Sequence, residues 1–382
     1  MKIGKLLTAV VCSAVILTGC KDIDTSIETY TEIQQIQQDG TTVESAVLPY
    51  VMENIPEKEA LCYDAFVNGV RAFQNEITLP ETLTPEEMRN LYITAYTEET
   101  DIYWLSGVYA PIPMDSDRIT VKYRYTQEES AEMQQKINLA VADVMKKVSP
   151  DATPYEKMAI FHDEIIKNCD FEKDTYYGIT VYGALVEGTA QCEGYANAFS
   201  YLCDIAGIEN ITVRGANAKG DSHVWNKVRI DGEWYNVDLT WDDPYMKRDA
   251  DNFVRHDYFF VSDPEIENIT HFPDESLFAH PNCTDASENY YIRNGLTVNT
   301  SEEATEMMKK LVAKAAVKKS TEVEIRFTDE SEYILAATSL FDNKEIKTIY
   351  ESVNAEKGTE ISNAYTYRND DLWILHVSLI YA

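Results

Sequence analysis

Hydrophobic and polar positions repeat with two different periods along this chain, and each period predicts a different element. In residues 154–169, a spacing of three to four residues places Met158, Phe161 and Ile165 on one face, which is typical of an amphipathic helix. The same spacing predicts further helices over residues 84–98, 130–148, 192–206 and 301–319. Alternation, or a short β-branched run, predicts strands over residues 118–125, 210–215, 322–328 and 372–382.

Residues 223–241 predict a β-hairpin, because Asp231-Gly232 favours a two-residue turn between alternating segments. If these two residues form the loop, Trp225 pairs with Asp238 and His223 with Thr240. One face then carries His223, Trp225, Lys227, Arg229, Trp234, Asn236, Asp238 and Thr240. The other face carries Val224, Val228, Ile230, Tyr235, Val237 and Leu239. We expect the second face to be core, with Trp241 on it, and the first to be polar.

Three side chains of this region suit nucleophilic catalysis. His223 and Asp238 are diagonal neighbours across the hairpin, so the carboxylate is able to orient the imidazole. Cys192 begins a helix, where unpaired amides favour a thiolate, and Gly194 leaves room for another element near the first turn. Glu193 opposes ionisation if it points toward the thiol. Spacing alone leaves open the alternative that all three residues are structural.

Two stretches, GALVEGTAQCEGYANAFSYLCDIAGI and SHVWNKVRIDGEWYNVDLTWDDP, resemble the bacterial transglutaminase-like superfamily. The resemblance runs from about Tyr155 to Asp263. It implies that Cys192 is the nucleophile, His223 the base and Asp238 the third member of a catalytic triad. We expect the Cys192 amide to donate to the oxyanion; Tyr182 is a second candidate donor, with a place in the core as the alternative.

The resemblance also implies attack of the thiolate on a carboxamide and a thioester intermediate. Water would then give hydrolysis, and an amine would give a cross-link. We expect a hydrolytic enzyme acting on peptide or protein amides, with no cofactor and no metal. A protein-glutamine gamma-glutamyltransferase and a catalytically silent scaffold are the alternatives. Trp225 and Trp234 are candidate walls of the substrate cleft.

The expected fold class is α+β. A papain-like transglutaminase core, implied by the resemblance, has a helix carrying Cys192 packed on an antiparallel sheet carrying His223 and Asp238. The expected segments are a signal peptide (1–19), a tether (20–44), an N-terminal mixed α/β region (45–149), the catalytic core (150–280) and a small C-terminal α+β accessory domain (281–382).

The N-terminus predicts export. Lys2 and Lys5 precede an apolar run that ends in Leu17-Thr18-Gly19-Cys20, which resembles a bacterial lipobox. We expect lipidation at Cys20 and an extracytoplasmic protein anchored to the cell membrane; a plain secretory signal is the alternative. The formal net charge is −32, which makes nucleic acid an unfavourable partner. The acidic loop 242–252 fits no EF-hand, so we expect a solvated turn there.

Overall fold

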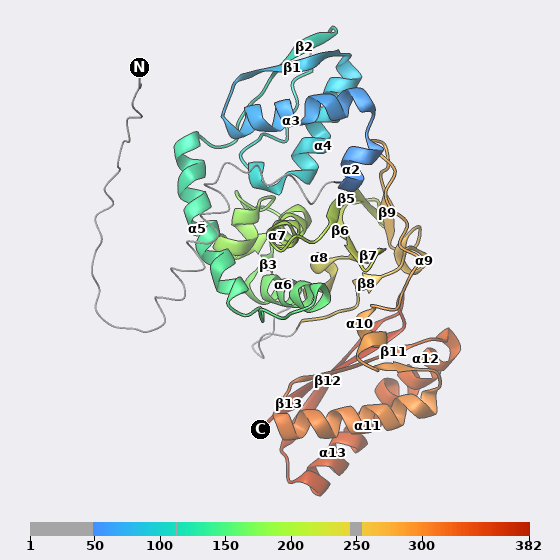
Figure 1. The fold of residues 1–382 in the computed structure, drawn as a ribbon. Coiled ribbons are helices and arrows are strands. Elements are labelled where there is room, and N and C mark those ends of the chain that lie inside the picture. Colours follow the sequence, from blue (N-terminus) through green and yellow to red (C-terminus); the bar gives the residue numbers. More distant parts are fainter. Residues whose placement is uncertain (1–48, 112, 245–253) are drawn as a thin grey trace, which may run out of the picture. The chain divides into compact units, whose positions relative to one another are not determined.

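The computed structural model describes residues 49–382, except residue 112 and residues 245–253 (Figure 1). Ser45–Ala382 form one compact unit. The predicted signal peptide 1–19 and tether 20–44, with the lipidation candidate Cys20, lie outside the described residues.

Helices and a strand pair make up the part of the chain before residue 121. Their bounds are α2 (Pro49–Asn54), α3 (Glu57–Arg71), β1 (Glu76–Leu83), α4 (Pro85–Glu98), η1 (Thr100–Ile102) and β2 (Ser116–Thr120). β1 and β2 pair antiparallel. The predicted strand 118–125 ends at Thr120, and only Tyr123 continues it, as an isolated bridge to Leu105.

Three long helices begin with the same local device. α4, α5 (Gln127–Met145) and α6 (Pro154–Asn168) follow Thr84, Thr126 and Thr153. Each threonine accepts a hydrogen bond from the amide of a glutamate three residues later, and the glutamate side chain accepts from the threonine amide. This capping box satisfies amides that the helix leaves unpaired, and it fixes where each helix starts.

A five-stranded antiparallel sheet lies at the centre of the unit, in the order β8-β7-β6-β5-β9. Its strands are β5 (Asn210–Asn217), β6 (Ser222–Ile230), β7 (Glu233–Val237), β8 (Phe259–Val261) and β9 (His271–Pro273). β6 and β7 pair from Asn226–Val237 to Ile230–Glu233. The predicted register of the hairpin is therefore confirmed over these residues.

Both faces of this sheet are buried, which corrects the expectation of one polar face. Val228, Tyr235 and Val237 pack against α5, α6 and α7 (Cys192–Ile205), as expected for the core side. On the opposite face, Trp225 and Trp234 join a second hydrophobic cluster with side chains of α3, α4 and β1. The N-terminal region thus covers the face that the hairpin alone would have left to water.

The helix that carries Cys192 lies between α6 and the sheet (Figure 1). α7 buries Tyr195, Phe199, Leu202 and Cys203, the apolar stripe expected from the spacing. Several short elements precede α7 in the chain or follow strands of the sheet. They are β3 (Asp170–Phe171), a π-helical turn η2 (Gly183–Glu187), β4 (Thr189–Ala190), α8 (Leu239–Asp242) and α9 (Asp263–Ile266).

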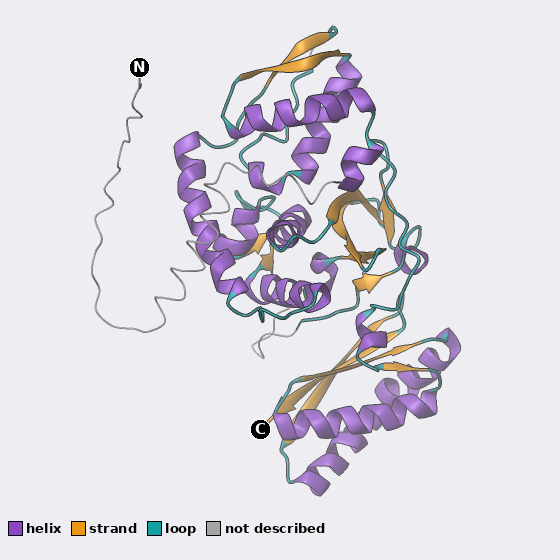
Figure 2. Cartoon of the chain, viewed as in Figure 1, coloured by secondary structure: helices purple, strands orange, loops and turns teal. Residues whose placement is uncertain are grey.

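A second mixed sheet, in the order β10-β11-β13-β12, forms the C-terminal part of the unit. The elements are α10 (Tyr290–Arg293), β10 (Thr297–Val298), α11 (Ser301–Lys318), β11 (Glu322–Phe327), α12 (Glu330–Ala337), η3 (Thr338–Asp342), α13 (Glu345–Lys357), β12 (Ile361–Asn369) and β13 (Ile374–Tyr381). α11 and α13 pack together on one face of the sheet and bury a core of their own (Figure 2). The whole is an α+β fold, as expected.

Candidate active site

Cys192 is the first residue of α7 and is partly exposed, whereas Cys203 on the same helix is fully buried. The chain reaches Cys192 through Gly188, whose φ of 70° is accessible to glycine without strain, and through the short strand β4. Gln191 precedes the helix with extended backbone angles. The thiol is therefore placed at the amide end of a 14-residue helix, where negative charge is stabilised.

Gly194 makes this helix start possible. A Cβ atom at Gly194 would lie 2.3 Å from the carbonyl oxygen of Gly178 and 2.9 Å from the Cβ of Ala190. The same Gly178 carbonyl accepts a hydrogen bond from the amide of Gln191 at 2.8 Å. The expectation that glycine lets another element approach the first turn is confirmed, and that element is the loop containing Gly178.

The carboxylate of Glu193, the residue after Cys192, has partners that compensate its charge. Its Oε1 accepts hydrogen bonds from Tyr96 Oη at 2.8 Å and from Arg214 Nη2 at 2.7 Å. Arg214 also lies over the Tyr96 ring, 5.3 Å from its centroid. The N-terminal region and β5 together supply the partners that neutralise this carboxylate.

His223 and Asp238 are in direct contact. His223 Nε2 lies 2.5 Å from Asp238 Oδ2, and the two residues are 4% and 1% exposed. His223 belongs to β6, whereas Asp238 follows the last residue of β7. The hairpin therefore brings the two side chains together, as its register predicts.

Cys192 lies close enough to the His223 ring to act on the pKa of that imidazole. Nε2 of the ring faces Asp238. Burial lowers the pKa of His223, but the charge and hydrogen bond of Asp238, followed by the contact with Cys192, raise it to about 10. The three residues singled out in the sequence thus meet at His223, and the imidazole is held in its charged form between a thiol and a carboxylate.

Asp238 has a second role, because it caps α8. Its Oδ1 accepts the amides of Thr240 at 2.9 Å and Trp241 at 3.2 Å, and its own amide donates to Tyr258 at 3.1 Å. These bonds fix one carboxylate oxygen and leave the other for imidazoles. Although burial raises the pKa of Asp238, its imidazole partners lower it well below the usual range.

A second histidine, which the sequence did not reveal, contacts the same carboxylate. His271 Nε2 lies 2.9 Å from Asp238 Oδ2, the oxygen that also faces His223. Burial lowers the pKa of His271, against the hydrogen bond and charge of Asp238. The residue lies in a three-residue edge strand, whose sequence His-Phe-Pro carries no periodic pattern that could have placed it.

The tryptophans are arranged differently from the expectation. Trp225 is 1% exposed and donates its Nε1 to Asn236, and Trp234 is 7% exposed and packs on Tyr50. Both are therefore core residues, which contradicts their placement as walls of a cleft. Trp241, expected in the core, is only partly buried and lies 5.5 Å from the His223 ring. Strand alternation fails at Trp241 because α8 begins at Leu239.

Tyr182 also needs correction as an oxyanion donor. Its ring is 3% exposed and packs on Tyr177 in the hydrophobic core. Its hydroxyl accepts a hydrogen bond from Lys136 Nζ on α5 at 3.1 Å. The core placement, which was the alternative, is therefore the correct one. The backbone amide of Cys192 stays the candidate donor.

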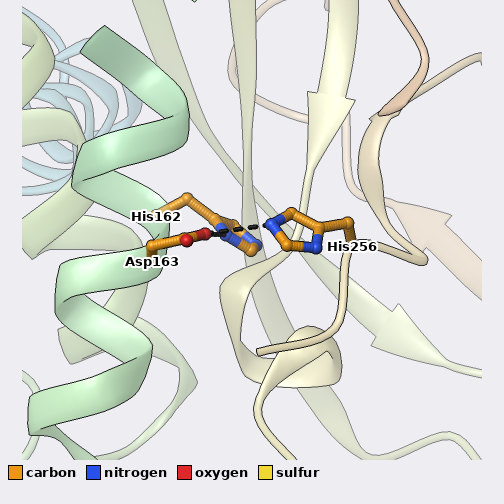
Figure 3. Close-up of side chains that lie close together, drawn as sticks. All are labelled: His162, Asp163 and His256. Atoms are coloured by element: carbon orange, nitrogen blue, oxygen red, sulfur yellow. Dashed lines mark hydrogen bonds and ion pairs between the residues drawn. The ribbon is translucent and has the colours of Figure 1, made fainter. Parts of the chain in front are cut away.

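Another histidine cluster contains His162, Asp163 and His256 (Figure 3). His162 and Asp163 of α6 face His256; the two imidazole rings stack at 5.1 Å, and Asp163 Oδ1 lies 2.9 Å from His256 Nε2. His162 Nε2 also meets Asp242 Oδ2 at 3.1 Å. His162 is fully buried among these polar partners. Asp242, expected in a solvated turn, is fully buried too, while residues 245–252 of that loop lie outside the described residues.

Buried charges continue from His256 into the C-terminal sheet. His376 of β13 lies between Asp257, 2.9 Å from Nε2, and Glu324 of β11, 3.2 Å from Nδ1. Tyr291 Oη lies within hydrogen-bonding distance of both carboxylates, 2.8 Å from Asp257 and 3.0 Å from Glu324. Burial lowers the pKa values of His256 and His376, but their carboxylate neighbours raise them to about 10 and about 9. These contacts tie the last sheet to the segment that follows α8.

Three groups within the described residues have donor atoms close enough to share a metal ion, all within 4.8 Å of one another. They are His162–Asp163–His256, His223–Asp238–His271 and Asp257–Glu324–His376. In each group the imidazole and carboxylate atoms already pair with one another. Hydrogen bonds and ion pairs within each group therefore explain why these side chains lie close together. Among the helices described, none is long and apolar enough to cross a membrane.

Comparison with known proteins supports the resemblance. Residues 142–239 match the family model described as Transglutaminase-like superfamily. Kyphoscoliosis peptidase from Mus musculus is 31% identical over 96 residues, which cover 22% of this chain and only 14% of the mouse protein. The human protein of the same name matches equally, at 31% over 96 residues. The chain thus spans a small part of the curated relatives.

Two solved structures match part of the chain. One is a TGase, with 16% identity, a TM-score of 0.27 and coverage of 43% of this chain and 48% of the other. The second is the periplasmic domain of TgpA from Pseudomonas aeruginosa, with 15% identity, a TM-score of 0.23 and coverage of 34% and 56%.

Proposed function

We propose that this chain, whose residues 142–239 belong to the transglutaminase-like superfamily, is a thiol hydrolase that cleaves amide bonds of peptides or proteins. The observation that carries the proposal is the position of His223, whose Nε2 contacts Asp238 Oδ2 and whose ring lies close enough to Cys192 for the thiol to act on its pKa. A thiol, an imidazole and a carboxylate in this order form the arrangement that activates a cysteine nucleophile.

The chemistry follows from these contacts. The Cys192 thiolate attacks the amide carbonyl, and the C–S bond forms as the carbonyl π electrons move to oxygen. The Cys192 backbone amide, at the start of α7, is placed to donate to that oxyanion. His223 gives its proton to the leaving nitrogen, the C–N bond breaks, and a thioester remains.

Water then resolves the thioester. His223, now neutral, accepts a proton from the attacking water, the C–S bond breaks, and the imidazolium–thiolate pair is restored. Asp238 stabilises the imidazolium in both halves of the cycle through the contact at 2.5 Å. Trp241, half-buried beside the His223 ring, is the aromatic side chain that we place next to the substrate.

The location of this activity is part of the proposal. A lipid on Cys20 would tether the enzyme outside the cytoplasm, at the membrane surface, where peptide or protein substrates reach it. The strongly negative chain would favour substrates that are neutral or basic.

The test offers glutamine-containing peptides and a labelled amine to the purified protein and reads the products by mass spectrometry. Shortened peptides that disappear with Cys192→Ala support hydrolysis. Incorporated amine would point to cross-linking, and the mass of a deamidated glutamine to side-chain hydrolysis. The matched control is Cys203→Ala, which removes a buried thiol from the same helix and should keep activity. Products that persist in Cys192→Ala would overturn the proposal.

A further inference from the structure

Two imidazoles converge on one carboxylate oxygen at this site. His223 Nε2 and His271 Nε2 lie 2.5 and 2.9 Å from Asp238 Oδ2. We infer that His271 is a positioning residue of the proposed reaction, which holds Asp238 in the orientation that His223 needs. The inference rests on the proposed function and extends the constellation from three residues to four.

The hydrogen bonds of Asp238 leave it little freedom. Oδ1 accepts the amides of Thr240 and Trp241, and Oδ2 faces the two imidazoles. A carboxylate has about four acceptor positions, so these four contacts use its capacity. Without His271, Oδ2 would face one donor only, and the carboxylate could turn about its Cβ–Cγ bond away from His223.

Contacts of the other ring nitrogen define the form of His271. Its Nδ1 lies 2.9 Å from Thr270 Oγ1, and that hydroxyl also lies 3.3 Å from the carbonyl oxygen of Ile266. A neutral ring that donates from Nε2 to Asp238 can accept the single proton of the Thr270 hydroxyl at Nδ1, in place of the longer bond from that hydroxyl to Ile266. Because the burial of His271 and the charge of His223 both lower its pKa, the neutral form is the one that fits beside a charged His223.

The position of His271 is fixed from several sides. Its ring lies 4.9 Å from Trp225, edge to face, and 4.7 Å from Trp241. Its strand β9 runs close against β5, since a Cβ at Gly215 would lie 2.2 Å from the carbonyl oxygen of Phe272. The His271 imidazole has no exposed surface. Burying such a polar ring among aromatic side chains costs free energy unless it makes a hydrogen bond, here to Asp238.

The test must separate positioning from simple packing. We choose His271→Gln, whose side-chain amide can reach the place of Nε2, and His271→Asn, whose shorter amide corresponds to Nδ1 and does not reach Asp238. His271→Leu removes both polar atoms and keeps the bulk. The readout is the rate at which Cys192 reacts with iodoacetamide across pH 4 to 9, which needs no substrate, together with circular dichroism to verify folding.

The expected direction follows from the hydrogen bond. His271 keeps Asp238 Oδ2 directed at His223; without this donor the carboxylate stabilises the His223 imidazolium less, which favours the uncharged thiol–imidazole pair and lowers thiol reactivity near neutral pH. The groups facing this pair from neighbouring elements are Cys192 of α7, His223 of β6 and Tyr258 before β8. We expect the alkylation rate of Cys192 at pH 7 to fall about tenfold in His271→Asn and His271→Leu, and a wild-type profile in His271→Gln.

Identical profiles in folded His271→Asn and wild type would overturn the role of His271. If His271→Leu does not fold, the comparison of the two amides still decides the question. His223→Ala distinguishes this failure from failure of the proposed function. When wild-type Cys192 reacts like an ordinary thiol and His223→Ala changes nothing, the triad itself is wrong; when only the His271 variants have no effect, the triad stands without a fourth member.

Discussion

Arg214 and Glu193 form an ion pair directly beside the candidate nucleophile, with 2.7 Å between Nη2 and Oε1. Arg214 comes from β5 and also donates from Nε to Thr97 at 3.0 Å. Arg214 of β5, far from Cys192 in the chain, therefore compensates the negative charge of Glu193, the residue that follows Cys192. The sequence predicts that Glu193 opposes ionisation of the thiol if its charge points there, and the ion pair with Arg214 compensates that charge.

We predict that Arg214→Gln slows alkylation of Cys192 at pH 7, by up to about tenfold, since an unpaired carboxylate next to the thiol opposes formation of the thiolate. The measurement is the second-order rate with iodoacetamide at low salt. Arg229→Gln is the matched control, because Arg229 pairs with Glu209 on the same sheet at 3.0 Å, away from the thiol. Equal rates in both variants would contradict the prediction.

Gly194→Ala should disrupt the start of α7. The added Cβ would meet a backbone oxygen at 2.3 Å, so the helix or the Gly178 loop must move, at a cost of about 3 kcal/mol or more. We expect a lower free energy of unfolding and loss of peptide cleavage. The control is Gly220→Ala, where φ is +80° but nothing lies within 4 Å of the new Cβ, and where strain costs about 1–2 kcal/mol. Similar losses in the two variants would count against the steric argument.

Trp241 and Trp225 should differ in what their removal affects. Trp241→Ala is expected to raise KM or lower kcat with a small change in stability, because the ring is half-buried beside His223. Trp225→Ala should instead destabilise the fold by about 3–5 kcal/mol, since the side chain is buried in the second core. Steady-state kinetics and denaturant unfolding check both. An unchanged KM and kcat in Trp241→Ala would remove this residue from the site.

Stability should fall as pH rises from about 6.5 to 10. Burial lowers the pKa values of His256 and His376, but carboxylate neighbours raise them to about 10 and about 9, above the value near 6.5 of unfolded histidine. Their ion pairs are therefore complete below pH 6.5 and are lost as pH passes the folded values. Asp163, Asp257 and Glu324 face these rings, with Tyr290 and Tyr291 beside them.

The midpoint of thermal unfolding, measured from pH 6 to 10, checks this direction. Glu324→Gln should destabilise the protein at pH 7 by about 3–5 kcal/mol, since it leaves charged His256 and His376 short of a partner, and it should flatten the alkaline decline. Glu306→Gln, on the exposed face of α11, should leave the profile unchanged. A midpoint that rises with pH would contradict the assignment of charged histidines.

Local patterns predicted the parts of the fold that local forces decide. The Asp231-Gly232 turn fixed the hairpin register, and Thr84 with Glu87 set the start of α4, because turn and cap geometry depend on adjacent residues. Alternation could not show that β7 ends at Val237, so Trp241 was assigned to the wrong environment. That end is determined by Asp238, whose side chain caps α8.

The remaining misses depend on contacts between distant segments. Tyr182 faces Lys136 of α5, and Trp225 is covered by the N-terminal region; neither neighbour can be read from the sequence around them. His271 reaches Asp238 across 33 residues from a strand of three. The resemblance pointed to Cys192, His223 and Asp238, because the two segments that carry them follow a family pattern, but a supporting residue outside that pattern becomes visible only in three dimensions.

The buried histidines and carboxylates shared by α6, the segment after α8 and the last sheet limit how this protein can be taken apart. A chain cut before residue 290 would leave His256 and Asp257 with their partners Glu324, Tyr291 and His376 removed. The final hundred or so residues, although they bury a core of their own, therefore share buried ion pairs with the segment after α8. A minimal fragment that contains Cys192 but lacks the last sheet would need apolar residues in place of His256 and Asp257. If the last sheet were exchanged between homologues, Glu324 and His376 would have to be transferred with it.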